Sequence, residues 1–137
     1  MANRQFNLPF AELVDRLTVD QINEVLLPAS RASYADEMKR IAADLDAMIN
    51  EQKISLNARL IRMIVVLAQM NMHIWINKDK MAQDSSKYLE YLKFAHQLNG
   101  VRNRIKNSLL TELGSTDQSA LRTNVATDGL DDSLVSI

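Results

Sequence analysis

The sequence contains no cysteine, only three glycines and two prolines, and few aromatic residues. The absence of cysteine excludes disulfide bonds, thiolate metal sites and thiol nucleophiles. Because β-sheets and tight turns use glycine and proline heavily, their scarcity predicts a chain of long helices. A formal net charge of -1 with 47% hydrophobic residues excludes a disordered chain and a strongly basic nucleic-acid binder. The length, 137 residues, corresponds to one domain.

Motifs of several enzyme classes are also missing. The sequence has no serine-nucleophile motif and no glycine-rich loop that could hold a phosphate. Its two histidines, His73 and His96, lack the spacing of a metal-binding pair. Basic residues are scattered rather than interleaved with aromatic ones, so we expect no binding to DNA or RNA duplexes. The common hydrolase and kinase sites are thereby excluded.

Signals for secretion or a membrane are weak. Met1–Pro9 has one arginine and no apolar core of a signal peptide. The longest uncharged stretch, Met63–Asn77, is shorter than the roughly 18–20 residues of a membrane span, and polar side chains interrupt it. We therefore expect a buried core helix rather than a membrane anchor. The expected location is the cytoplasm, or a host cytoplasm.

Apolar residues repeat at helical spacing in four successive segments. This pattern predicts an all-α antiparallel bundle of four main helices over residues 1–114. The first segment, Phe10–Leu27, is either one helix or two with a kink at Thr18, because Thr18 and Gln21 have the spacing of a capping box. Pro28 ends this segment.

The second helix is expected to begin after Ser30 or Ser33. Its apolar stripe runs from Tyr34 to Ile49, and Asp44 is among the charged residues that lie off the stripe. This arrangement predicts an amphipathic helix with Asp44 on its solvent side.

The third helix is predicted over Leu56–Asp84, with Ser55 as its cap. Its apolar residues occur on nearly all sides, which is typical of a helix at the centre of a bundle or in contact with a second subunit. We therefore expect a homo-oligomer, most simply a dimer with an isologous helical interface.

The fourth helix is expected to begin at Ser85 or Ser86 and to end at Gly114. Gly100 interrupts it at a cost of about 1 kcal/mol relative to alanine, which indicates a close packing contact at that position. Residues 115–137 form an acidic C-terminal tail. Its composition favours a flexible tail, whereas apolar residues such as Leu121 and Val125 favour packing on a neighbouring surface.

Polar residues lie within the apolar faces of the last two helices. Asn71 falls on the stripe of the third helix, and the fourth helix carries four polar residues along one edge: Asn99, Arg102, Asn103 and Lys106. Buried amides and guanidinium groups are costly unless they are hydrogen-bonded, so each needs a partner. One interpretation is intramolecular pairing, for example of Arg102 with Asp79 or Asp15.

The other interpretation is a small anionic ligand, such as a nucleotide. Arg102 and Lys106 would then contact phosphates, and Trp75 would stack on a base. The remaining candidate residues, which would bind polar edges of the ligand, are Asn71, Asn99 and Asn103.

Several sequence pieces resemble a helical family of unknown function. They are Leu13-Val14-Asp15-Arg16-Leu17-Thr18, Asn71-x-x-x-Trp75 with Lys78-Asp79, and Leu98-Asn99-x-x-Arg102-Asn103. That family is similar to the MazG-type all-α nucleotide pyrophosphohydrolases, and the resemblance covers roughly Leu13 to Leu110. Proteins of this style also resemble accessory proteins of tailed bacteriophages, some of which sequester nucleotide signals of host defence.

The resemblance implies a Mg²⁺ site, whose ligands in this chain would be Glu12, Asp15 and Asp79. Where the family pattern has Glu-Asp, this chain has Lys78-Asp79. Because Lys78 replaces a carboxylate of the family pattern with a cation, this chain is better suited to binding a ligand than to metal-dependent hydrolysis of it. Without the resemblance, the favoured interpretation of these carboxylates is ordinary surface or capping charge.

Three functional hypotheses follow. The first is non-catalytic binding of a nucleotide-type anion by a helical oligomer, with no cofactor. The second is a Mg²⁺-dependent pyrophosphohydrolase of the MazG type. The third is a structural or adaptor protein whose polar residues fix helix register.

Overall fold

The computed structural model describes residues 4–113 and 121–126. Over these residues the fold is all-α, as the sequence predicts, and contains no strand. Its four long helices are α1 (Phe10–Leu26), α2 (Arg31–Gln52), α3 (Ala58–Gln83) and α4 (Tyr88–Glu112). Short 3-10 turns at Pro28–Ser30 and Ser85–Lys87 lead into α2 and α4.

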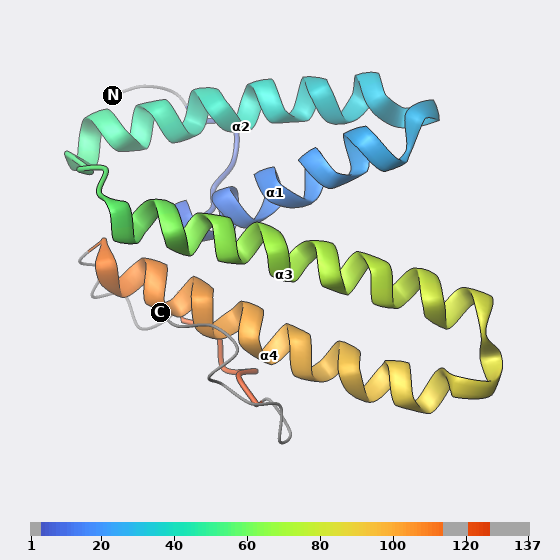
Figure 1. Cartoon of the computed structure of the whole chain (residues 1–137). Helices are drawn as coiled ribbons and strands as arrows, with labels where there is room; N and C mark the ends of the chain where they lie inside the picture. Colours follow the sequence, from blue (N-terminus) through green and yellow to red (C-terminus); the bar gives the residue numbers. More distant parts are fainter. Residues whose placement is uncertain (1–3, 114–120, 127–137) are drawn as a thin grey trace.

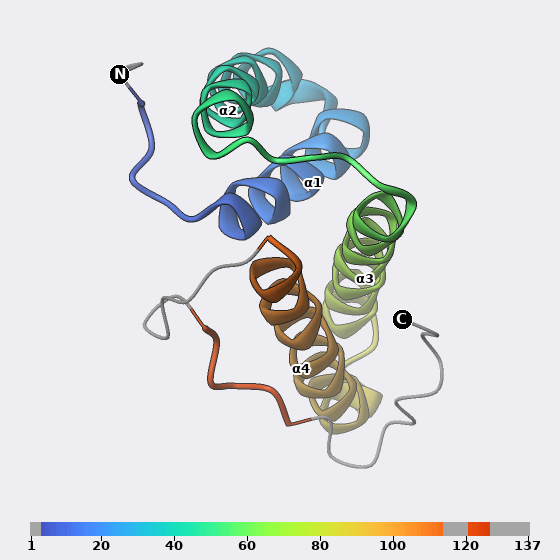
Figure 2. The ribbon, with the colours of Figure 1, turned by 90° about the vertical axis from the view of Figure 1, so that its left-hand side faces the viewer.

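The helices form two antiparallel hairpins, α1–α2 and α3–α4 (Figure 1). Figure 2 shows α1 between α2 and the α3–α4 pair, so that α1 joins the two hairpins. The core lies along α1 and between α3 and α4, and its largest fully buried apolar side chains are Leu13, Ile41, Leu60, Met63, Leu67 and Leu109.

Helix α1 is continuous, and the predicted alternative of a kink at Thr18 is wrong. The Thr18 hydroxyl donates to the Asp15 carbonyl oxygen at 2.7 Å, so it bonds back into the preceding turn and does not cap a new helix. Gln21, the other half of the predicted capping box, donates instead to the Glu24 side chain at 3.0 Å. The helix ends at Leu26, two residues before Pro28.

The caps of the later helices differ in detail from the sequence prediction. Helix α3 begins at Ala58, because the side chain of Asn57, not Ser55, accepts a hydrogen bond from the Leu60 amide at 2.8 Å. Before α4, the Asp84 side chain accepts from the Ser86 amide. The predicted end of the fourth helix, Gly114, lies outside the described residues.

Asp44 is buried, and its predicted place on the solvent side of the second helix is wrong. It is 2% exposed, and its carboxylate accepts the backbone amides of Gln5 at 3.0 Å and Phe6 at 2.7 Å. These bonds fasten the segment before α1 onto α2. A carboxylate can be buried here because two orphan amides supply its hydrogen bonds.

Helix α3 has two apolar faces. The inner face packs in the core, with Met63 and Leu67 at 0% exposure, whereas Ile61 and Val65 on the other side are 47% and 58% exposed. Of the helices that the structure describes, α3 alone is long and apolar enough to cross a bilayer. This finding rests on length and composition only, and the core helix of a soluble protein passes the same test.

Candidate functional site

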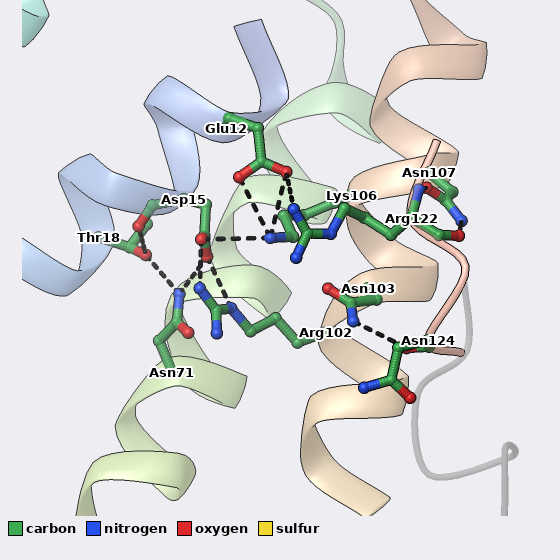
Figure 3. A network of polar contacts seen from close by, with 10 residues as sticks. All are labelled: Glu12, Asp15, Thr18, Asn71, Arg102, Asn103, Lys106, Asn107, Arg122 and Asn124. Carbon is green, nitrogen blue, oxygen red and sulfur yellow. Dashed lines mark hydrogen bonds and ion pairs between the residues drawn. The ribbon is translucent and has the colours of Figure 1, made fainter. Parts of the chain in front are cut away.

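A network of polar side chains joins α1, α3 and α4 (Figure 3). Glu12 and Asp15 are three residues apart on α1, and Arg102 and Lys106 are four apart on α4. Residues at these spacings share a helix face, so each helix presents two charges of one sign to the other helix. The sequence predicted the cationic edge of α4 but left its partner open.

Asp15 is the centre of the network. It is 4% exposed and accepts hydrogen bonds from both Nε and Nη2 of Arg102, the former at 3.0 Å, and from Nδ2 of Asn71 at 2.8 Å. Burial alone would raise the pKa of Asp15, but the Arg102 guanidinium, Asn71 and the Lys106 ammonium together outweigh burial and hold it below its ordinary value.

Lys106 lies between the two carboxylates of α1. Its side chain is 3% exposed, and Nζ lies 3.3 Å from the Glu12 carboxylate and 3.5 Å from Asp15 Oδ2. An isolated ammonium group at this depth would be strongly disfavoured. The two carboxylates therefore account for the burial of Lys106 without any bound anion.

Asn71 connects α3 to α1. Besides its bond to Asp15, Nδ2 donates to the Thr18 hydroxyl at 2.7 Å, and that hydroxyl in turn donates to the Asp15 carbonyl. The buried amide is thus satisfied within the protein. Of the two intramolecular partners considered for Arg102, the structure selects Asp15 and not Asp79.

Asp79 does not join the other candidate metal ligands. It is exposed, lies eight residues or about 12 Å along α3 from Asn71, and accepts a hydrogen bond from Gln83 at 2.9 Å. Glu12 and Asp15 are close to each other but share Lys106. Within residues 4–113 and 121–126, no group of three histidine or carboxylate side chains could hold a metal ion.

Three other residues were predicted to bind the ligand: Asn103, Asn99 and Trp75. None of them has a hydrogen bond to Asp15 or Glu12 among the contacts described above. Asn103, 1% exposed, donates to the backbone oxygen of Asn124 at 2.7 Å. Asn99 lies one turn before Asn103 on α4 and is half-buried, as is Trp75, one turn beyond Asn71 on α3.

A segment of the chain, residues 121–126, lies along α4 and closes one side of the network (Figure 3). The side chain of Asn107 accepts from the Arg122 amide at 2.7 Å and donates to the Arg122 carbonyl at 2.9 Å. Arg104 Nε donates to the Val125 carbonyl at 2.8 Å. Arg122 Nη1 lies 3.5 Å from Glu12, so this segment adds a third cation to the two carboxylates.

Gly100 is the position where this segment comes closest to α4. A Cβ at residue 100 would lie 1.9 Å from the Ala126 carbonyl oxygen, so no side chain fits there. The predicted close packing at Gly100 is confirmed. For the described part of the tail, the prediction of packing on a neighbouring surface also holds, and Leu121 packs against the core. Residues 115–120 and 127–137 lie outside the described residues.

Sequence reasoning missed Thr18, Asn107, Arg104 and Arg122 as members of this network. Asn103 and Asn107 are one helical turn apart, and Gly100 lies one turn before Asn103. This pattern suits contacts with an extended backbone segment. Nothing in the sequence alone, however, indicated that residues 121–126 are that segment.

Comparison with protein-family models, with curated proteins and with solved structures gave no match. The MazG-like and phage resemblances therefore stay predictions.

Proposed function

We propose that the protein is a non-catalytic helical adaptor that acts through protein–protein contact and associates with itself. The observation that carries this proposal is the outward face of α3, where Ile61, Val65, Met72 and Ile76 are between 36% and 58% exposed. Exposed apolar residues that gather on one face and are rimmed by polar residues often mark a protein–protein interaction site.

The polar network supports the same proposal. Asp15, Lys106 and Asn71 satisfy one another across α1, α3 and α4. A buried network of this kind can fix which helix faces meet, at little or no gain in stability. It therefore suits a scaffold that holds α3 with its apolar face outward.

Nucleotide binding is the competing hypothesis. Its main candidates, Arg102 and Lys106, already contact carboxylates, so a phosphate would have to compete with Asp15 for them. Thermal unfolding with a panel of nucleotides, with and without Mg²⁺, separates the hypotheses. A ligand at a hundred times its Kd adds about 2.7 kcal/mol, a shift of several degrees. We expect no shift.

The test of self-association is light scattering after gel filtration, with the protein at tens of micromolar. We expect a dimer, and we expect Val65→Glu to be a folded monomer because it places a charge within the apolar stripe. The matched control is Ala43→Glu on the exposed side of α2, which should remain dimeric. A wild-type monomer at these concentrations would refute the proposal, and a Mg²⁺-dependent nucleotide shift would favour the enzyme.

A further inference from the structure

One face of α4 holds residues 121–126 by their backbone (Figure 3). Side chains on this face donate hydrogen bonds of 2.7–2.9 Å to backbone carbonyl oxygens of the segment, and the donors are Asn103, Arg104 and Asn107. Asn107 also accepts the Arg122 amide at 2.7 Å, so it binds both polar backbone groups of one residue. At Gly100 the Ala126 carbonyl oxygen comes so close that a Cβ would lie 1.9 Å from it. These four residues of α4 follow one another at intervals of three, one and three and share a helix face, which we call the backbone-binding face.

Two side chains of the segment make contacts beyond this face. Leu121 packs against the core, and Arg122 Nη1 lies 3.5 Å from the Glu12 carboxylate. The next two side chains, Thr123 and Asn124, are exposed. A leucine and the cation after it are therefore recognised through their side chains, whereas the residues that follow are bound through their backbone. This division is typical of peptide recognition, in which main-chain hydrogen bonds give affinity and a few side chains give specificity.

The segment is held by contacts that another extended chain could replace. Residues 122–124 and Ala126 are exposed, and Leu121 and Val125 are half-buried. Each hydrogen bond at such a surface contributes little, because water offers the same bond when the segment leaves. The entropic cost of ordering the segment opposes the sum of these bonds. A segment that only completed the fold would gain more from burying apolar side chains, so this mode of binding suits an exchangeable occupant.

We infer that the backbone-binding face is a site for an extended peptide of a partner protein, and that residues 121–126 occupy it as an intramolecular competitor. The peptide that fits this site has a leucine, then an arginine or lysine, then residues bound mainly through their backbone. The inference goes beyond the proposed self-association and is independent of it, because the backbone-binding face and the exposed face of α3 lie on different helices.

Peptide binding to full-length variants tests this site. The probe is a fluorescent peptide with the sequence of residues 121–126, and fluorescence anisotropy measures its binding. Arg122→Glu in the protein places a negative charge beside Glu12 and should release the chain's own segment; because the Arg122 side chain is 49% exposed, the helices should stay folded. We expect the peptide to bind this variant about ten-fold more tightly than the wild type, since a competitor that leaves the face vacant in about a tenth of the molecules weakens the apparent Kd by that factor.

A second substitution locates the bound peptide. Asn107→Ala, added to Arg122→Glu, removes the two-point contact with the peptide backbone and should weaken binding by about ten-fold or more. Alanine is the best helix former, so α4 should keep its structure, and circular dichroism checks it. The matched control is Asn50→Ala, added to Arg122→Glu on the exposed side of α2, which should bind the peptide as Arg122→Glu alone does.

Variants of the peptide test which of its parts are recognised. Thr123→Ala with Asn124→Ala in the peptide should leave the Kd within about two-fold, because these side chains face water. Leu121→Asp in the peptide should abolish binding. The reverse pattern, with the leucine dispensable and the two polar side chains required, would overturn the inference.

Three further results would each overturn the inference. The first is no binding of the peptide to Arg122→Glu, and the second is equal binding with and without Asn107→Ala. The third is equal binding to Arg122→Glu and to the wild type, which would mean that residues 121–126 do not compete. Calorimetric titration of the wild type at about 20 and about 200 µM identifies the competitor: an intramolecular one gives the same apparent Kd at both concentrations, whereas weaker binding at the higher concentration would assign the face to the tail of a second copy and overturn the inference. A monomeric wild type would refute the proposed self-association and leave this inference standing.

Discussion

Removal of the Asp15 carboxylate should be among the most destabilising single changes in this protein. In Asp15→Ala, Arg102 loses its two-point partner, and Lys106, with a side chain 3% exposed, keeps only the Glu12 carboxylate. Breaking a buried ion pair on one side typically costs about 3–5 kcal/mol, because the remaining charge stays buried. For a domain of this size that loss lowers Tm by roughly 10–15 °C.

Urea unfolding at pH 7, followed by far-ultraviolet circular dichroism, measures this loss. The matched control is Arg59→Ala, which breaks the Arg59–Glu112 pair on the surface, where the side chains are 55% and 30% exposed. Exposed pairs contribute about 0–1 kcal/mol, so the control should unfold almost as the wild type does.

A double replacement separates the cost of an unpaired charge from the value of the pair. In Asp15→Leu with Lys106→Met both buried charges are removed together, and apolar replacement of a whole buried pair is often close to neutral. We expect the double variant to be more stable than Asp15→Ala, and Arg102, which is 24% exposed, can turn toward water. If Asp15→Ala is as stable as Arg59→Ala, then Arg102 and Lys106 do not depend on Asp15. The reasoning would then be refuted, and binding of an external anion would become the better explanation of these cations.

Two further predictions concern pH and the segment along α4. Burial, together with the neighbouring Glu37 carboxylate, raises the pKa of Asp20 from 3.8 to about 6, and its Oδ2 is buried without a hydrogen-bond partner. Between these two pKa values, Asp20 therefore binds a proton more readily in the folded state than in the unfolded chain. The contribution of Asp20 to the free energy of unfolding should consequently increase as pH falls from 7 toward 4. Asp20→Asn should remove that dependence and raise stability at pH 7 by about 1–3 kcal/mol, measured by urea unfolding at pH 5 and 7; an unchanged pH profile would contradict the assignment. Gly100→Ala should displace residues 121–126, because its Cβ would lie 1.9 Å from the Ala126 carbonyl oxygen, and hydrogen exchange should show faster exchange at the Arg122 amide. Unchanged protection there would mean that α4 accepts a side chain at this position.

Local features of this protein could be predicted from its sequence. The scarcity of glycine and proline and the helical spacing of apolar residues predicted four helices, because helix formation depends on neighbours three and four residues apart. The position of Gly100 within an otherwise good helix predicted a close contact, since glycine at such a site is costly unless a side chain has no room. The apolar residues on both sides of the third helix predicted its outward stripe.

The pairing of polar groups between helices was decided by the tertiary structure. The sequence allowed Arg102 to meet Asp79 or Asp15, and only the packing of α1 against α4 brings Asp15 to the guanidinium. Asp44 looked like a solvent-facing residue, because its helix position alone does not show that two amides of a distant segment meet it there.

The sequence by itself therefore determined the helices, their apolar faces and the set of polar residues that needed partners. The tertiary structure decided which partner each polar residue has and which apolar face remains outside. The physical reason is that helix formation and amphipathicity are set by short-range spacing along the chain, whereas a hydrogen bond or ion pair between helices requires positioning to within a few tenths of an ångström, and that depends on the packing of all four helices together.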